Sequence, residues 1–198
     1  MYASKLTKEI KNAALNLLTL INEKRDGRIK GRVCADGRKQ RIYIRKYDVA
    51  SPTMQLESLM ITLLIDAYEG RGVATVDMVG AYLMADMNDT IIVKLTGYSV
   101  KLICKTNEKY KKFITIENGK EFLCKKLLKA LYGCMQSAIF WYETFKGCLE
   151  ALGFKLNKYD LFIANKIIDG NQCTVGLYVD DTKISHVKTK SSIRSLNN

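Results

Sequence analysis

GLYVDDTKIS, residues 176–185, interrupts an apolar run with two adjacent carboxylates, Asp180 and Asp181. Neighbouring side chains on a regular strand point to opposite faces of the sheet, so two adjacent aspartates fit poorly inside a buried strand. They fit the tight end of a hairpin, where they are either ordinary turn residues or a device for holding something positive. The segment therefore predicts two antiparallel strands joined at Asp180–Asp181.

A third carboxylate, Asp77, ends a second apolar stretch, VATVDM (residues 73–78). An unpaired carboxylate at the end of a buried strand is costly, so its presence there needs a reason. Asp77 and Asp180 are 103 positions apart, and a helix predicted at residues 137–154 would let their strands lie side by side. We therefore expect the three aspartates to converge at neighbouring strand ends.

Three carboxylates with no histidine or lysine base nearby are poorly suited to acid–base chemistry on their own. They suit Mg²⁺, which prefers hard oxygen ligands and keeps positions open for water and substrate phosphates. Two such ions can hold the attacking and leaving oxygens of a phosphoryl transfer. The sequence is also compatible with the alternative that Asp180 and Asp181 are ordinary solvated turn residues.

Charge is unevenly distributed along the 198 residues, whose formal net charge is +12. Residues 1–50 contain 13 basic and 5 acidic side chains, residues 51–100 contain 2 and 6, and the rest of the chain is basic again. A uniformly basic surface would indicate only a polyanionic partner. Basic segments around an acidic one indicate a polyanion held near bound cations, although a solvated face explains most charge runs.

The composition indicates a globular α+β chain, with 26% charged and 47% hydrophobic residues. We find no apolar run of membrane-spanning length and no signal peptide, so we expect no membrane partner and a cytoplasmic or nuclear location. None of the six cysteines forms a C-x-x-C pair and there is one histidine, which argues against a zinc site. Reduced cysteines are expected in such a compartment.

The first half of the chain is expected to alternate helices with basic strands. Apolar residues at helical spacing predict an amphipathic helix over residues 6–21. Residues 24–46 contain ten Lys or Arg against two Asp, and their glycines and alternating isoleucines predict exposed, phosphate-facing hairpin strands. A helix capped by Ser51, with Pro52 in its first turn, should stop at Gly70. Strands are expected at residues 73–78 and 90–95.

The second half is expected to be mainly antiparallel. Asn118-Gly119 predicts a tight hairpin, because this dipeptide favours a type I′ turn. A helix over residues 137–154 should end near Gly153 and bury an apolar stripe. That stripe is Phe140, Trp141, Phe145, Leu149 and Leu152, and we interpret it as core rather than as a ligand site. Asp169-Gly170 and Asp180-Asp181 should turn the last three strands into one another.

Five blocks of this sequence, in order and at similar spacing, resemble the reverse transcriptase domain of Ty1/copia-type retrotransposon polyproteins. They are KRDGRIKGRVCADGRKQR (24–41), SPTMQLES (51–58), VDMVGAYL (76–83), KALYGCMQSAIFWYETF (129–145) and YVDD (178–181). The resemblance covers nearly the whole chain. It implies a right-hand polymerase with a basic fingers region with flanking helices (1–75) and a palm (76–198), whose small antiparallel sheet is backed by helices.

The resemblance also implies partners, cofactors and site residues. The partners would be an RNA or DNA template-primer and deoxynucleoside triphosphates, with two Mg²⁺ ions, or Mn²⁺ as a substitute. Asp77, Asp180 and Asp181 would be the catalytic metal ligands, with the Met78 carbonyl as an extra ligand. The other implied contacts are Lys30 and Arg32 with the triphosphate, Tyr82 with the ribose, Gln136 with nucleotide and template, and Arg38 and Arg41 with the nucleic-acid backbone. Tyr82 could instead be a core tyrosine, and Gln136 a plain polar residue at a helix start.

The sequence departs from the family pattern in two places. After Gln136 it reads SAIF (residues 137–140), where many members have proline and arginine. It also ends 17 residues after Asp181, whereas the family continues into the rest of the palm, a thumb-like connection and an RNase H domain. We therefore expect a C-terminally truncated copy. The alternative function is a non-catalytic, nucleic-acid-binding remnant, which would keep the basic hairpin and the sheet.

Overall fold

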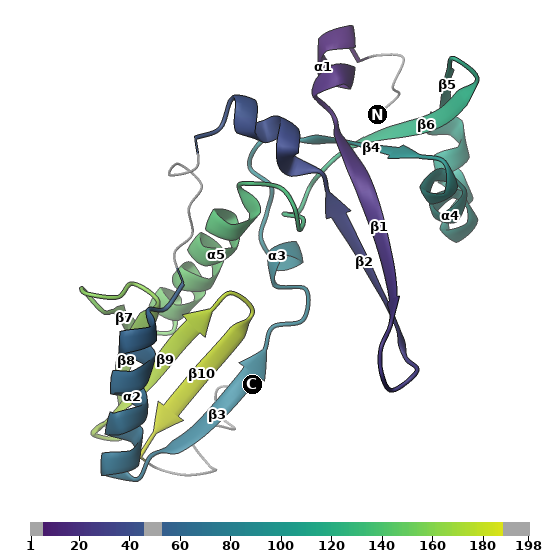
Figure 1. The fold of residues 1–198 in the computed structure, drawn as a ribbon. Helices are drawn as coiled ribbons and strands as arrows, with labels where there is room; N and C mark the ends of the chain where they lie inside the picture. The colour runs from purple at the N-terminus through teal and green to yellow at the C-terminus, as the bar shows by residue number, and fades with distance from the viewer. Residues whose placement is uncertain (1–5, 46–52, 188–198) are drawn as a thin grey trace. The chain divides into compact units, whose positions relative to one another are not determined.

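The computed structural model describes residues 6–45 and 53–187 and has the mixed α+β architecture that the sequence predicts. The chain divides into two compact units, and each unit is built from two stretches of sequence. The first unit comprises Met1–Ala50 and Tyr82–Phe140, and the second comprises Ser51–Ala81 and Trp141–Asn198. Among the described residues each unit contains one five-stranded sheet (Figure 1).

The first unit begins with a short helix and a long hairpin. Helix α1 (Lys8–Ala13) is followed by β1 (Leu15–Glu23), β2 (Ile29–Ala35) and the 3₁₀ helix η2 (Gly37–Ile42). The predicted helix over residues 6–21 is therefore wrong beyond Ala13. Its second half pairs antiparallel with β2 and, at Leu15, parallel with β4. Tertiary strand pairing overrides the local helical spacing here.

The remainder of the first unit completes its sheet in the order β2-β1-β4-β6-β5. Its elements are α3 (Ala81–Met84), β4 (Ile92–Thr96), α4 (Tyr98–Thr106), the 3₁₀ helix η4 (Glu108–Phe113), β5 (Thr115–Glu117) and β6 (Lys120–Lys126). The predicted hairpin turn is confirmed, because Asn118 and Gly119 both have the positive φ that a type I′ turn needs, 52° and 71°. The strand expected at residues 90–95 is also confirmed as β4.

The second unit is an antiparallel sheet with a helix on each face (Figure 1). Its strand order is β3-β10-β9-β8-β7. Its elements are α2 (Leu56–Glu69), β3 (Gly72–Asp77), α5 (Ser137–Ala151, which belongs to this unit from Trp141 onward), β7 (Lys155–Leu156), β8 (Ile163–Ile168), β9 (Asn171–Tyr178) and β10 (Asp181–His186). Phe145 and Leu149 of α5 pack on a buried cluster that includes Val175. On the opposite face, Asp66 of α2 forms an ion pair with Lys183 of β10.

The predicted ends of the two long helices are confirmed, but the predicted start of α2 and the predicted burial of Leu152 are not. Helix α2 ends at Gly70, which has a left-handed φ of 62°, whereas it begins only at Leu56. The predicted Ser51 cap and Pro52 lie outside the described residues. Trp141 is buried, as predicted, but Leu152 is 54% exposed because α5 ends one residue before it. None of the described helices is both long and apolar enough to span a membrane.

Candidate active site

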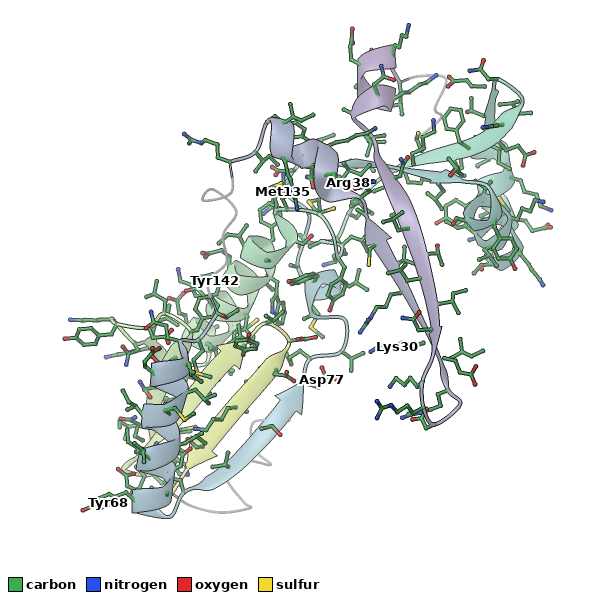
Figure 2. The ribbon with its side chains drawn as sticks, in the orientation of Figure 1. Lys30, Arg38, Tyr68, Asp77, Met135 and Tyr142 are labelled. Atoms are coloured by element: carbon green, nitrogen blue, oxygen red, sulfur yellow. The ribbon has the colours of Figure 1, made fainter. Side chains whose placement is uncertain are left out.

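Asp77 and Asp181 lie directly opposite each other on neighbouring strands of the second unit. Strands β3 and β10 are antiparallel, with a register that runs from the pair Asp181 and Asp77 to the pair His186 and Gly72. Directly opposite residues of such a pair project from the same face, with their Cβ atoms about 4.5–5.5 Å apart. The expected convergence of these two aspartates is therefore confirmed, and Figure 2 shows Asp77 at the end of β3.

Asp180 lies in the two-residue turn beside this pair. Tyr178 is paired with Asp181, so Val179 and Asp180 form the turn between β9 and β10. The predicted turn at Asp180–Asp181 is thus displaced by one residue, and Asp181 is the first residue of β10. The backbone N–H of Met78 donates a 2.8 Å hydrogen bond to the Asp180 carbonyl, which ties the turn to the end of β3. All three aspartates therefore meet at one end of the sheet.

These three carboxylates have no compensating cation among the described residues. Asp77 and Asp181 are exposed and Asp180 is half-buried, and no described lysine or arginine forms an ion pair with any of them. Lys183 follows Asp181 by two residues and shares its strand face, but its ammonium pairs with Asp66. Like charges directly opposite each other destabilise a sheet. This sheet end thus has an uncompensated negative charge.

Two paired carboxylates fit a magnesium site that is completed by a substrate. Mg²⁺ is commonly bound through one or two carboxylates together with substrate phosphates, rather than by an all-protein cage. Within residues 6–45 and 53–187 no three His, Cys, Asp or Glu side chains are close enough to hold a metal by themselves. The Met78 carbonyl accepts a hydrogen bond from the Ala81 N–H, which leaves one of its two lone pairs available.

One residue of this site was not identified as functional from the sequence. Trp141 of α5 donates a 2.8 Å hydrogen bond from Nε1 to the carbonyl oxygen of Val179, the first residue of the turn. Its aromatic spacing predicted only a core residue, and it is indeed only 4% exposed. A buried indole N–H usually has a hydrogen-bond acceptor. The need for such an acceptor was the only feature of the sequence that could have indicated this contact.

Lys30 and Arg32 lie two residues apart on β2, so both side chains project from one face of the β1–β2 hairpin. Both are exposed, and Figure 2 shows Lys30 on this hairpin. Arg38 lies beyond the hairpin and pairs with Asp36 at 2.6 Å, although its own side chain is 81% exposed. The guanidinium of Arg38 hydrogen bonds to Asp36 and holds the pKa of that carboxylate at about 2. Arg41 is exposed in η2.

Gln136 is buried in the first unit and belongs to a hydrogen-bonded network. Its Oε1 accepts a 2.6 Å hydrogen bond from Gln40, and its Nε2 donates a 3.0 Å bond to Asp89. Gln40 is fully buried and also accepts the Met135 N–H. Sequence reasoning missed Gln40 and Asp89, because neither is close to Gln136 along the chain. The network fixes the orientation of the Gln136 side chain.

Tyr82 is half-buried in the first unit and packs against another aromatic ring. Its ring centroid lies 4.4 Å from that of Tyr132, with the planes tilted by 40°. This contact agrees with the alternative of a packed tyrosine.

Comparison with known proteins identifies the protein family to which this fold and this acidic sheet end belong. A family model described as reverse transcriptase (RNA-dependent DNA polymerase) matches residues 5–196, and the chain belongs to this family. Among its relatives is the Transposon Ty1-MR1 Gag-Pol polyprotein of Saccharomyces cerevisiae, 27% identical over 177 residues. The Transposon Ty1-DR4 Gag-Pol polyprotein of the same yeast is 27% identical over 171 residues. Each match covers 84% of this chain but only 8% and 9% of the respective polyprotein.

Proposed function

We propose that this chain transfers nucleotides from deoxynucleoside triphosphates to a primer 3′-hydroxyl, as the RNA-directed DNA polymerase domain of a Ty1/copia-type retrotransposon. The observation that carries the proposal is the pairing of Asp77 with Asp181, because it places two uncompensated carboxylates on one strand-end face. Family membership supports the same conclusion.

The residues that would hold Mg²⁺ are Asp77, Asp180 and Asp181, with the Met78 carbonyl as a further oxygen donor. Bound magnesium would lower the pKa of the primer 3′-hydroxyl and stabilise the pyrophosphate leaving group. The chain's own contribution is to hold the carboxylates at one sheet end, through the β3–β10 register and the bond from Met78 to Asp180.

The basic residues of the first unit would bind the substrates. Lys30 and Arg32, on one hairpin face, suit the triphosphate, because two cations two residues apart on a strand can approach the same polyanion. Arg38 and Arg41 are proposed to contact the nucleic-acid backbone, Tyr82 the ribose, and Gln136 the nucleotide and template. We also propose a fingers region (1–75), a palm (76–198) and a cytoplasmic or nuclear location, in a retroelement particle.

Primer extension tests the proposal. The chain should extend a DNA primer annealed to an RNA template when Mg²⁺ and dNTPs are present, and Asp180→Asn and Asp181→Asn should each abolish incorporation. Asp169→Asn is the matched control, because Asp169 is an exposed turn aspartate of the same sheet with no proposed metal role. Equal incorporation by the wild type and the two site variants would overturn the metal role.

A second candidate, a nucleic-acid-binding domain without catalysis, is favoured by one observation. The exposed hairpin face with Lys30 and Arg32 can attract a polyanion without any bound metal. This candidate predicts salt-sensitive, sequence-independent binding of oligonucleotides with no incorporation by any variant.

A further inference from the structure

We propose that Trp141 is a positioning residue that selects one of two backbone conformations for the Val179–Asp180 turn and so aims the Asp180 carboxylate. This inference rests on the proposed function, because the turn carries a proposed metal ligand. Its structural part can be tested without any catalytic assay.

The turn has an unfavourable residue at its first position. Val179 has a φ of 58°, which is unusual for a β-branched side chain. Asp180 is not among the described residues with positive φ. A positive φ at only the first of the two central residues is the pattern of a type II′ turn, whereas a type I′ turn has positive φ at both.

Types I′ and II′ differ in the orientation of the peptide plane between the two central residues. In this hairpin that plane contains the Val179 carbonyl and the Asp180 N–H. Asp180 could adopt the positive φ of the alternative turn, because aspartate tolerates the left-handed region. A flip of this plane would therefore be accessible, and it would redirect the Asp180 side chain.

Trp141 holds this plane in one orientation. Its Nε1–H, which can only donate, lies 2.8 Å from the Val179 carbonyl oxygen. The indole itself is 4% exposed and packs against Phe145 at a centroid distance of 5.6 Å, so the donor has little freedom to move. A flipped peptide would point its carbonyl away from the indole and leave a buried donor unsatisfied, which is costly.

The neighbouring Tyr142 supplies a matched comparison. It is also on α5, is 8% exposed, and donates from its hydroxyl to a backbone carbonyl, that of Leu161, at 3.4 Å. Its ring stacks on Phe162 rather than contacting the turn. Removing its hydroxyl tests the loss of a hydrogen bond from an aromatic side chain elsewhere in the same unit.

Hydrogen exchange of single amides gives the first test. The Met78 N–H reports on the turn, because it donates to the Asp180 carbonyl, and the Leu177 N–H, which donates to the Phe162 carbonyl, reports on the body of the sheet. We expect Trp141→Phe to accelerate exchange of Met78 at least ten-fold and that of Leu177 less than two-fold. Tyr142→Phe should leave Met78 unchanged. Unchanged Met78 exchange in Trp141→Phe, or equal acceleration at both amides, would overturn the inference.

Substitution of Val179 gives the second test. Glycine at the first turn position favours type II′, whereas asparagine there favours type I′, although both relieve the left-handed strain of valine. In the Trp141→Phe background, Val179→Gly should restore slow Met78 exchange and Val179→Asn should not. Equal effects of the two substitutions would show that Trp141 only fills the core.

Primer extension links the turn to catalysis. Trp141→Phe should lower kcat at least ten-fold while the KM for dNTP changes less than two-fold, and Val179→Gly should recover part of that kcat. A change confined to KM would contradict the positioning role. If no variant and no wild-type protein extends a primer, the proposed function fails, and the exchange experiment still decides the turn selection. Trp141 is the single tryptophan of the chain, so the loss of its indole resonance verifies each variant that carries Trp141→Phe.

Discussion

Asp77 lies directly opposite Asp181 across β3 and β10, although the two residues are 104 positions apart in the sequence. This pairing places two exposed like charges on one face of a sheet end, with the third aspartate in the adjoining turn. A sheet gains nothing from such an arrangement by itself, because opposed like charges are destabilising. Under the proposed function this arrangement has a role, because a bound divalent cation would offset the repulsion.

Removal of one of these charges should stabilise the protein in the absence of divalent metal. Asp181→Asn should raise the free energy of unfolding by about 0.5 kcal/mol, because it relieves the repulsion from Asp77. Urea denaturation in EDTA measures this change. Added Mg²⁺ and dNTP should then stabilise the wild type more than the variant. A variant that is less stable in EDTA would argue against repulsion at this site.

The buried pair of Asp66 and Lys183 should be costly to break on one side only. Lys183 and Asp66 are 9% and 5% exposed, so Asp66→Ala would leave an ammonium uncompensated inside the unit. We expect a loss of about 3–5 kcal/mol in unfolding free energy, as for other half-removed buried pairs. The double variant Asp66→Leu/Lys183→Met should recover most of this loss in thermal denaturation. Additive losses would contradict the coupling of the two residues.

Neutralising the hairpin face should weaken nucleic-acid binding in a salt-dependent way. Lys30→Gln/Arg32→Gln should reduce the slope of log affinity against log salt by about 0.7 for each phosphate of a single strand that the protein no longer neutralises. Fluorescence anisotropy with a labelled oligonucleotide measures the slope. Lys155→Gln/Lys158→Gln, two exposed lysines of the second unit, is the control of equal charge. An equal loss of affinity in both double variants would leave no role for the hairpin face.

The pair of Asp36 and Arg38 predicts a gain of binding upon mutation. The hydrogen bond from Arg38 holds the pKa of Asp36 at about 2, so the carboxylate stays ionised and competes with phosphate for Arg38. The stabilising interaction is present above the unfolded pKa and is lost only as pH falls through about 2, so binding should show no step from Asp36 at neutral pH.

Asp36→Asn should therefore tighten oligonucleotide binding about two-fold or more at low salt, since charge contacts dominate such affinities. The equivalent pair of Asp26 and Arg28 offers a comparison, because Arg28 also binds an aspartate two residues before it, at 2.7 Å. Asp26→Asn should have a smaller effect if Arg38 contacts the backbone. Equal gains would assign no special role to Arg38.

The acidic site was predictable because its signals are local and chemical. Two adjacent aspartates in an apolar run, and Asp77 at the end of another run, indicate strand ends from residue types alone. Asn118-Gly119 and Gly70 likewise have the positive φ that their residue types favour. The register that sets Asp77 opposite Asp181 is a finding of the structure, because antiparallel pairing alone allows other registers.

The features that the sequence could not indicate are those that depend on contacts between residues distant along the chain. Leu15–Glu23 has helical spacing, yet it forms β1 because β2 and β4 offer strand partners. Gln136 was predicted to contact nucleotide and template, with a plain polar residue at a helix start as the alternative, and neither prediction indicated its hydrogen bonds with Gln40 and Asp89. Trp141 was interpretable as core from its spacing, whereas the acceptor for its N–H lies 38 positions away.

Paramagnetic broadening by Mn²⁺ tests the central claim, a divalent metal site at the paired strand ends, most directly. In the presence of a dNTP, substoichiometric Mn²⁺ should broaden the amide resonances of Asp77, Met78, Asp180 and Asp181 first. Asp77→Asn should remove this selectivity, and Asp169→Asn should preserve it. Broadening that begins elsewhere in the chain, or that is identical in Asp77→Asn and the wild type, would contradict the account.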